Sequence, residues 1–271
     1  MRRSLLLSSV GQALLLVTLT FDASAQALSA FTAEDMARVA SVTILDVSED
    51  GRRVAAAVRR PADNETVDHR RYGDPTYLTP SQVTLQIVDA RSGEKEQPFK
   101  TLVNVRDAAW SRDGRQLAIL LARGPATADA FPSTALYIWD ADRRSLAEVA
   151  VGGSAAVALN SNLSWAPDGS SLIVALRSPD LDREARTRFA ALTGGPIIVH
   201  TSSEPFLEWD LLQRSTRSRS LAAIDPRTGA VRPLLPQGRI TSYQPSRDGS
   251  FVSVMEDVTE LFRESGFNAF K

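Results

Sequence analysis

The chain of 271 residues contains no cysteine and only two histidines, His69 and His200. The lack of cysteine excludes disulfides, thiolate catalysis and a lipid attached at a cleavage-site cysteine. There is no H-x-x-x-H pattern, so we expect no metal site, and no glycine-rich phosphate loop indicates a cofactor. The 31 basic and 32 acidic residues give a net charge of −1. Without a basic stripe, nucleic acid is not an expected partner.

Serine–histidine catalysis within this chain is not expected either. The G-x-S-x-G elbow that holds a hydrolase nucleophile does not occur, and Gly152–Ala156 (GGSAA) lacks its second glycine. We interpret His69 as a solvated loop residue and His200 as the end of a strand. Asp180 and Asp182 stand among arginines in an expected helix, which indicates surface ion pairs. The sequence therefore assigns no catalytic, cofactor-binding or metal-binding residue.

The first residues have the pattern of a signal peptide for export. Arg2 and Arg3 supply a positive charge, Leu5–Phe21 is mostly apolar, and Ala23–Ala25 (ASA) offers small residues for cleavage before Gln26. An apolar run this short and interrupted is a poor membrane span. We expect the first 25 residues to be removed, leaving a protein of the bacterial periplasm or exterior with no membrane contact.

One phrase recurs four times along the chain: an apolar stretch, an Asp-Gly pair and a second apolar stretch. The four pairs are Asp50-Gly51, Asp113-Gly114, Asp168-Gly169 and Asp248-Gly249. Glycine accepts the positive φ that a tight hairpin needs, so each phrase predicts one β-hairpin. Apolar residues at every second position after the turn predict a strand with one buried face.

A second phrase alternates with the first and ends each time in an aspartate and a polar turn. Its copies are LQIVDARSGE from Leu85, LYIWDADRRS from Leu136 and LAAIDPRTGA from Leu221. Two hairpins per period make four antiparallel strands, which is the composition of a propeller blade. The predicted fold is all-β: a partial β-propeller over residues 39–271, with about four blade units, the last incomplete. The alternative is a β-sandwich with chance Asp-Gly turns.

The segments around the blades carry further expectations. Residues 26–38 form a helical lead-in, capped by Thr32 with Asp35 as the capping-box acid. The Asp-Gly pairs lie 63, 55 and 80 residues apart, more than the roughly 40–45 residues of a lean blade. The excess predicts inserts at about 61–80 and 178–220, the second with a short helix at Asp180–Leu192 followed by loop and strand.

These phrases resemble the "PDG" units of bacterial periplasmic propellers, best matched by Ala166–Gly169 (APDG). The stretch from Phe31 to Asp257 resembles the propellers of prolyl oligopeptidase family serine peptidases, which open with a similar T-x-E-D helix. The resemblance does not choose among dipeptidyl-peptidase-like members, acylaminoacyl-peptidase-like members and the similar lasso-peptide isopeptidases, in which a propeller precedes a hydrolase domain. The Trp139-Asp140 pair is weaker evidence for true WD repeats. TolB-like propellers, which bind partner proteins without catalysis, are the alternative.

The resemblance implies a propeller that limits which peptides reach a C-terminal α/β-hydrolase domain. That domain is missing from this chain, so the chain alone is expected to be inactive. Insert residues Arg71, Tyr72, Glu204 and Trp209 could touch a peptide, but they are interpreted as ordinary loop and strand residues. Two other accounts stay open: a four-bladed ring closed by N-terminal strands, and a gene product without a function of its own.

Overall fold

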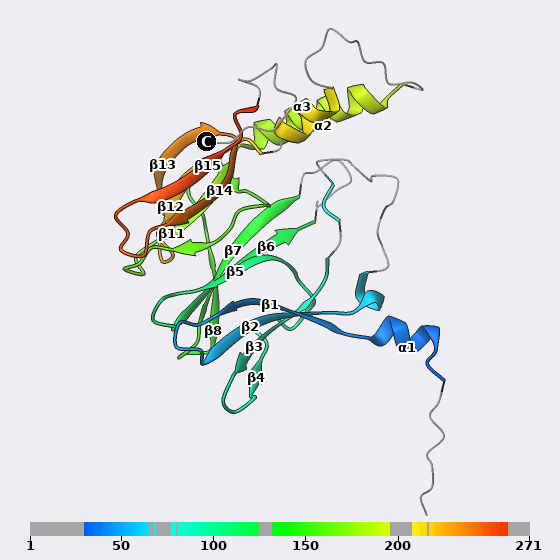
Figure 1. Cartoon of the computed structure of the whole chain (residues 1–271), viewed down its shortest axis with the longest axis vertical. Coiled ribbons are helices and arrows are strands. Elements are labelled where there is room, and N and C mark those ends of the chain that lie inside the picture. The colour runs from blue at the N-terminus through cyan, green and yellow to red at the C-terminus, as the bar shows by residue number, and fades with distance from the viewer. Residues whose placement is uncertain are drawn as a thin grey trace, which may run out of the picture.

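The computed structural model describes residues 30–64, 68, 77–79, 81–124, 132–195, 208–215 and 217–259. The chain forms a row of antiparallel sheets, each built from strands that follow one another in sequence (Figure 1). Blade 1 consists of β1 (Ser41–Val47), β2 (Arg53–Arg59), β3 (Thr84–Asp89) and β4 (Lys95–Glu96). Blade 2 consists of β5 (Asn104–Trp110), β6 (Gln116–Arg123), β7 (Ser133–Asp140) and β8 (Ser145–Val149).

Blade 3 has an interrupted inner strand, and the last sheet has two strands in the part of the chain that is described. Blade 3 consists of β9 (Ala156–Val157), β10 (Ser164–Trp165), β11 (Leu172–Arg177), β12 (Arg219–Ile224) and β13 (Val231–Gly238). Both β9 and β10 pair with β11, so together they take the place of one inner strand. The half-blade consists of β14 (Ile240–Pro245) and β15 (Val252–Glu256). The predicted blade architecture, with an incomplete last unit, is confirmed.

Among the described residues, four helical segments stand outside the sheets: α1 (Ala33–Arg38), η1 (Pro61–Asn64), α2 (Pro179–Thr193) and α3 (Glu208–Ser215). The capping box at Thr32 is present, and α2 covers the helix expected in the second insert. The prediction was wrong for Trp209, which lies in helix α3 rather than in a loop or strand. None of the helices in the described ranges is long and apolar enough to cross a membrane.

The recurring Asp-Gly turn is stabilised by a small network of side-chain hydrogen bonds. In blade 1, Asp50 Oδ1 accepts hydrogen bonds from Ser48 Oγ at 2.6 Å and from the Arg52 amide at 3.0 Å. Ser48 Oγ in turn accepts from the Arg53 amide at 2.8 Å. The glycine that follows has a φ of +67°. Aspartate and glycine recur in every copy of this turn, and serine recurs at Ser48, Ser111 and Ser246, whereas blade 3 has Ala166 at that position.

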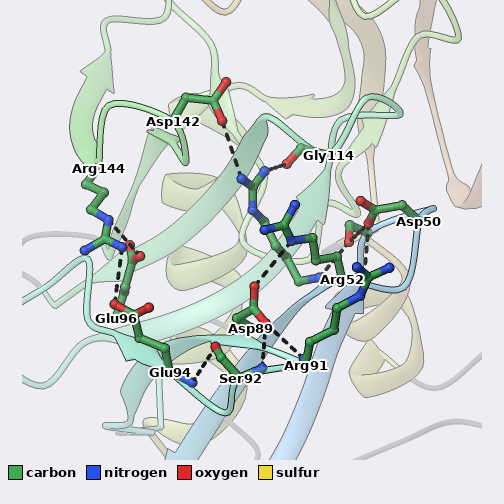
Figure 2. Close-up of polar contacts among 12 residues, drawn as sticks. Asp50, Arg52, Asp89, Arg91, Ser92, Glu94, Glu96, Gly114, Asp142 and Arg144 are labelled. Carbon is green, nitrogen blue, oxygen red and sulfur yellow. Dashed lines mark hydrogen bonds and ion pairs between the residues drawn. The ribbon is translucent and has the colours of Figure 1, made fainter.

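The second phrase ends in a turn of its own, shown for blade 1 in Figure 2. Asp89 Oδ1 accepts hydrogen bonds from the amides of Ser92 and Arg91, both at 2.9 Å. These two bonds, that of Ser92 first, lower the pKa of Asp89 to about 2. Four residues after the aspartate the backbone has positive φ, at Gly93, Arg144 and Gly229 in blades 1, 2 and 3.

The middle strands are buried on both faces, whereas the sequence predicted one buried face. On β6, Leu117 and Ile119 pack against blade 1, while Ala118 and Leu120 pack against blade 3. All four side chains are fully buried. A strand between two neighbouring blades has no solvent side, so its sequence is continuously apolar rather than alternating. The hydrophobic core accordingly consists of the layers between successive blades.

The row of blades is open among the described residues. No described strand joins β1 to β15, and the two lie at opposite ends of the row (Figure 1). Val42 and Ile44 on β1 remain 63% and 62% exposed because no described blade covers that face. Val47 is also exposed, whereas Trp110 and Trp165 at the matching positions of blades 2 and 3 are buried. The four-bladed ring closed by N-terminal strands is therefore not observed in this part of the chain.

Two glycines at the same turn position provide a test of this packing. A Cβ at Gly229 would overlap the carbonyl oxygen of Ala150, whereas a Cβ at Gly93 would meet nothing within 4 Å. Both have positive φ, so alanine is strained at either site. We expect Gly93→Ala to lower the free energy of unfolding by about 1 kcal/mol and Gly229→Ala by about 3 kcal/mol or more. Urea denaturation measures both; equal losses would contradict the close approach of blades 2 and 3.

Candidate functional site

Antiparallel strands sort the connections of every blade onto two faces. The turn face carries the hairpin turns that follow β1, β3 and their counterparts in the other blades. The insert face carries the described ends of the connections that follow the second strand, within residues 60–83, 124–132 and 178–218, together with α1. In Figure 1, α1 and the pair α2 and α3 lie far apart, but both are on the side away from the turns that join β1 to β2 and β14 to β15. Long connections, where binding residues concentrate, therefore share one face.

The charges of the turn face largely compensate one another. Arg53 donates to the carbonyl of Gly114, and its Nη2 lies 3.4 Å from Asp142 Oδ1. These two contacts join blade 1 to blade 2 (Figure 2). Arg144 forms ion pairs with Glu94 at 3.2 Å and with Glu96 at 3.1 Å. A cavity of about 790 Å³ on this face is lined by side chains of both signs. These exposed ion pairs link neighbouring turns, and each contributes little to the free energy of unfolding.

The insert face holds a cavity of about 490 Å³ between blades 2 and 3, which we call the insert-face cavity. Residues 77–79 from the insert of blade 1 and residues 132–134 at the start of β7 form two of its walls. The segment 156–160 of blade 3 and the first turns of α2 form the others, and Arg106 and Arg177 also line it. Its volume lies within the roughly 300–1,000 Å³ of small-ligand sites.

Arg106 reaches this cavity from a β-bulge in the inner strand of blade 2. The register of β5 against β6 shifts between Val105 and Asp107, which leaves Arg106 as the extra residue. A bulge redirects the side chain of the extra residue. At the corresponding bulges, Leu45 of blade 1 packs into the core, and Thr241 of the half-blade donates to a backbone carbonyl. Arg106 is the charged member of this set.

The electrostatic surroundings of Arg106 leave its guanidinium largely available. Its Nε donates to the carbonyl of Leu159 at 3.0 Å, and within the described ranges it forms no ion pair. The side chain is exposed by area, yet partial desolvation by the neighbouring atoms lowers its pKa from the ordinary value. An arginine with a lowered pKa is still protonated at neutral pH.

The other two charges that line the cavity are paired with each other. Arg177, only 9% exposed, donates from Nε to Asp182 and from Nη1 to the carbonyls of Ser215 and Ser218 at 3.1 and 2.9 Å. It therefore fixes α2 and the end of α3 onto β11. Asp180 pairs with Arg183 at the surface, as expected. Asp182 departs from the expected surface pair, because its partner is a buried arginine at the end of a strand.

Two aspartates on inner strands connect successive blades. Asp46 Oδ2 accepts from the Trp110 amide of blade 2, and Asp107 Oδ2 accepts from the Leu163 amide of blade 3, both at 2.6 Å. Burial raises the pKa of Asp107, opposed by the hydrogen bonds from Leu163 and Ala108, and the nearby charge of Asp46 raises it further. These carboxylates serve as connections between blades, because each is occupied by backbone N–H groups.

The half-blade is attached to blade 3 through a buried arginine and a buried tyrosine. Arg219 donates to the carbonyls of Ile240, Asn160 and Thr241 at 2.5, 2.8 and 2.9 Å. The Tyr243 hydroxyl lies 2.9 Å from Ser161 Oγ. Burial lowers the pKa of Arg219 and raises that of Tyr243. Both side chains are enclosed by structural partners and are not accessible to a ligand.

The structure does not test the residues that the sequence suggested for catalysis or for substrate contact. His69, Arg71, Tyr72, His200 and Glu204 lie outside the described residues, and only the backbone of Trp209 is described. Over the described ranges there is no group of three potential metal ligands. Sequence reasoning missed Arg106, because a β-bulge leaves no readable signal within an apolar strand pattern.

Comparison with known proteins adds no family assignment: no family model and no curated protein matches the chain. Solved structures do match. The β-propeller domain of the Trilobed protease from Pyrococcus furiosus aligns with 86% of this chain and 53% of its own, with 11% identity and a TM-score of 0.47. TolB from Acinetobacter baumannii aligns with 86% of this chain and 41% of its own, with 14% identity and a TM-score of 0.42.

Acylaminoacyl peptidase from Pyrococcus horikoshii aligns with 79% of this chain at 11% identity and a TM-score of 0.42. The chain spans 28% of that protein and at most 53% of the other two. At these identities and TM-scores the matches carry no argument about function. The fold class, an array of β-propeller blades, is established by the strand pairing of the chain itself.

The link between blades 2 and 3 can be tested at Asp107. We expect Asp107→Ala to lower the free energy of unfolding by about 2 kcal/mol, since it removes a charged acceptor from the backbone amides of Ala108 and Leu163, both of which are buried residues. Asp142→Ala, which removes an exposed carboxylate on the turn face, should cost less than about 1 kcal/mol. Urea denaturation compares the two variants. A smaller loss for Asp107→Ala than for Asp142→Ala would refute the link.

Proposed function

We propose that this chain is the N-terminal propeller portion of an exported prolyl oligopeptidase-like serine peptidase. Its part is to restrict the peptides that reach a catalytic α/β-hydrolase domain outside these 271 residues. Peptide-bond or isopeptide-bond hydrolysis would occur there through an acyl-enzyme. The signal-peptide pattern of the first 25 residues supports a place in the periplasm or outside the cell.

The observation that carries the proposal is the division of the blades into two unlike faces. The described parts of the long connections and the insert-face cavity belong to one face, while the described turns of the other face are short and joined by ion pairs. A propeller that controls access to a partner domain needs variable segments and a hollow on the side that substrate passes. A propeller with only a structural role needs neither.

Binding of a partner protein without catalysis, as in TolB-like propellers, would use the same blades differently. In that case a flat or grooved face would contact a folded protein, and no hydrolase domain would be encoded. The described residues of the insert face include a concave site rather than only a flat one. This favours a small or extended ligand such as a peptide.

The proposal predicts the sequence encoded beyond Lys271. Reading the locus past that codon in all three frames should show a G-x-S-x-G elbow followed by an aspartate and then a histidine. Further Asp-Gly blades and then a stop would favour the binding propeller instead. A stop with nothing propeller-like after it would contradict both.

The same proposal predicts that the 271-residue chain alone is inactive. With succinyl-Ala-Ala-Pro-p-nitroanilide as substrate, we expect no release of nitroaniline above the buffer rate. Hydrolysis that co-purifies with the chain and survives a mock purification control would overturn the assignment of catalysis to another domain.

A further inference from the structure

Arg106 is the one charged side chain lining the insert-face cavity that has no opposite charge among the described residues. The two other charged residues there, Arg177 and Asp182, are paired with each other. Arg106 uses only Nε, for the carbonyl of Leu159 at 3.0 Å. Its two terminal nitrogens therefore keep their donors available beside the hollow.

The placement of Arg106 is fixed by the backbone rather than by a flexible loop. It occupies the bulge of β5, an inner strand paired with β6 along its length. The Nε bond to Leu159 ties the guanidinium to blade 3 as well. A side chain held at both ends of its stem loses little conformational entropy when it binds a ligand.

We propose that Arg106 binds a carboxylate of a peptide lodged in the insert-face cavity. This inference rests on the proposed function, since it assigns the peptide contact of the gating face. The carboxylate is either the C-terminus of the peptide or an acidic side chain, because a guanidinium recognises both through the same pair of N–H groups.

The surroundings suit such a ligand. The cavity of about 490 Å³ is large enough for a few residues of peptide. Leu78, Pro132 and Val157 are among the apolar residues that line the same cavity. Partial desolvation of Arg106 strengthens its attraction for an anion, since the effective dielectric is lower than in water.

The test compares three peptides by calorimetric titration of the full chain. The probes are acetyl-tetra-alanine with a free C-terminus, acetyl-tetra-alanine amide, and acetyl-Ala-Asp-Ala-Ala-amide. We expect at least one peptide that carries a carboxylate to bind about tenfold or more tightly than the neutral amide. Which of the two does so identifies the source of the carboxylate. The preference should weaken as sodium chloride is raised.

The variants Arg106→Gln and Arg115→Gln separate this site from general electrostatic attraction. Both remove one positive charge, but Arg115 lies on the turn face and pairs with Asp142. We expect Arg106→Gln to abolish the carboxylate preference, Arg106→Lys to retain part of it, and Arg115→Gln to leave it unchanged. Thermal denaturation shows whether Arg106→Gln is folded. If it is not, the proposal is tested by the carboxylate preference of Arg106→Lys and by the salt dependence of peptide binding to the natural chain.

The possible failures are distinguishable. A carboxylate preference that persists in Arg106→Gln, or equal binding of all three peptides, overturns the role of Arg106 and leaves a peptide-contacting propeller in place. If none of the three peptides binds the natural chain at millimolar concentration, the proposed function fails together with the inference.

Discussion

The middle strands of blades 2 and 3 must be buried on both faces, and most of the structure depends on this constraint. Leu117 and Ile119 cannot be covered without blade 1, nor can Ala118 and Leu120 without blade 3. A single four-stranded sheet would leave both of its apolar faces in water. The blades therefore stabilise one another as a stack, in the manner of repeat proteins whose units contact their neighbours.

Polar contacts also join neighbouring blades, both along the inner strands and on the turn face. On the inner strands, Asp46 and Asp107 each accept an amide hydrogen bond from the next blade. On the turn face, Arg53 of blade 1 reaches Gly114 and Asp142 of blade 2. Arg219 performs the corresponding task between blade 3 and the half-blade, with carbonyl groups as its only partners in the described ranges. Apolar layers set the spacing of the blades, and these contacts set their orientation.

Local chemistry explains which features were predictable from the sequence. The Asp-Gly hairpins, the Asp89-type turns and the Thr32 cap are encoded within a few residues, so they could be read directly. The two-sided burial of β6 was missed because it depends on neighbouring blades, even though the run LAILLA is continuously apolar. Helix α3 was missed because its eight residues carry no cap signal comparable to Thr32.

The candidate site was the least predictable part. Arg106 is next to Asp107 in the sequence. Nothing in the sequence shows that the Arg106 guanidinium lies at a cavity while the Asp107 carboxylate joins two blades. The bulge of β5 separates their roles by turning the two side chains to different surroundings. The residues singled out from composition, such as Arg71 and Glu204, belong to inserts whose length alone suggested function.

The central claim is that the insert face, not the turn face, meets the ligand. Hydrogen exchange of the full chain, with and without the peptide that binds it most tightly, tests this most directly. The account predicts slower amide exchange at residues 156–160 and at the start of β7, with no change at the turns of residues 111–116 and 167–171. Slower exchange confined to those turns would contradict it.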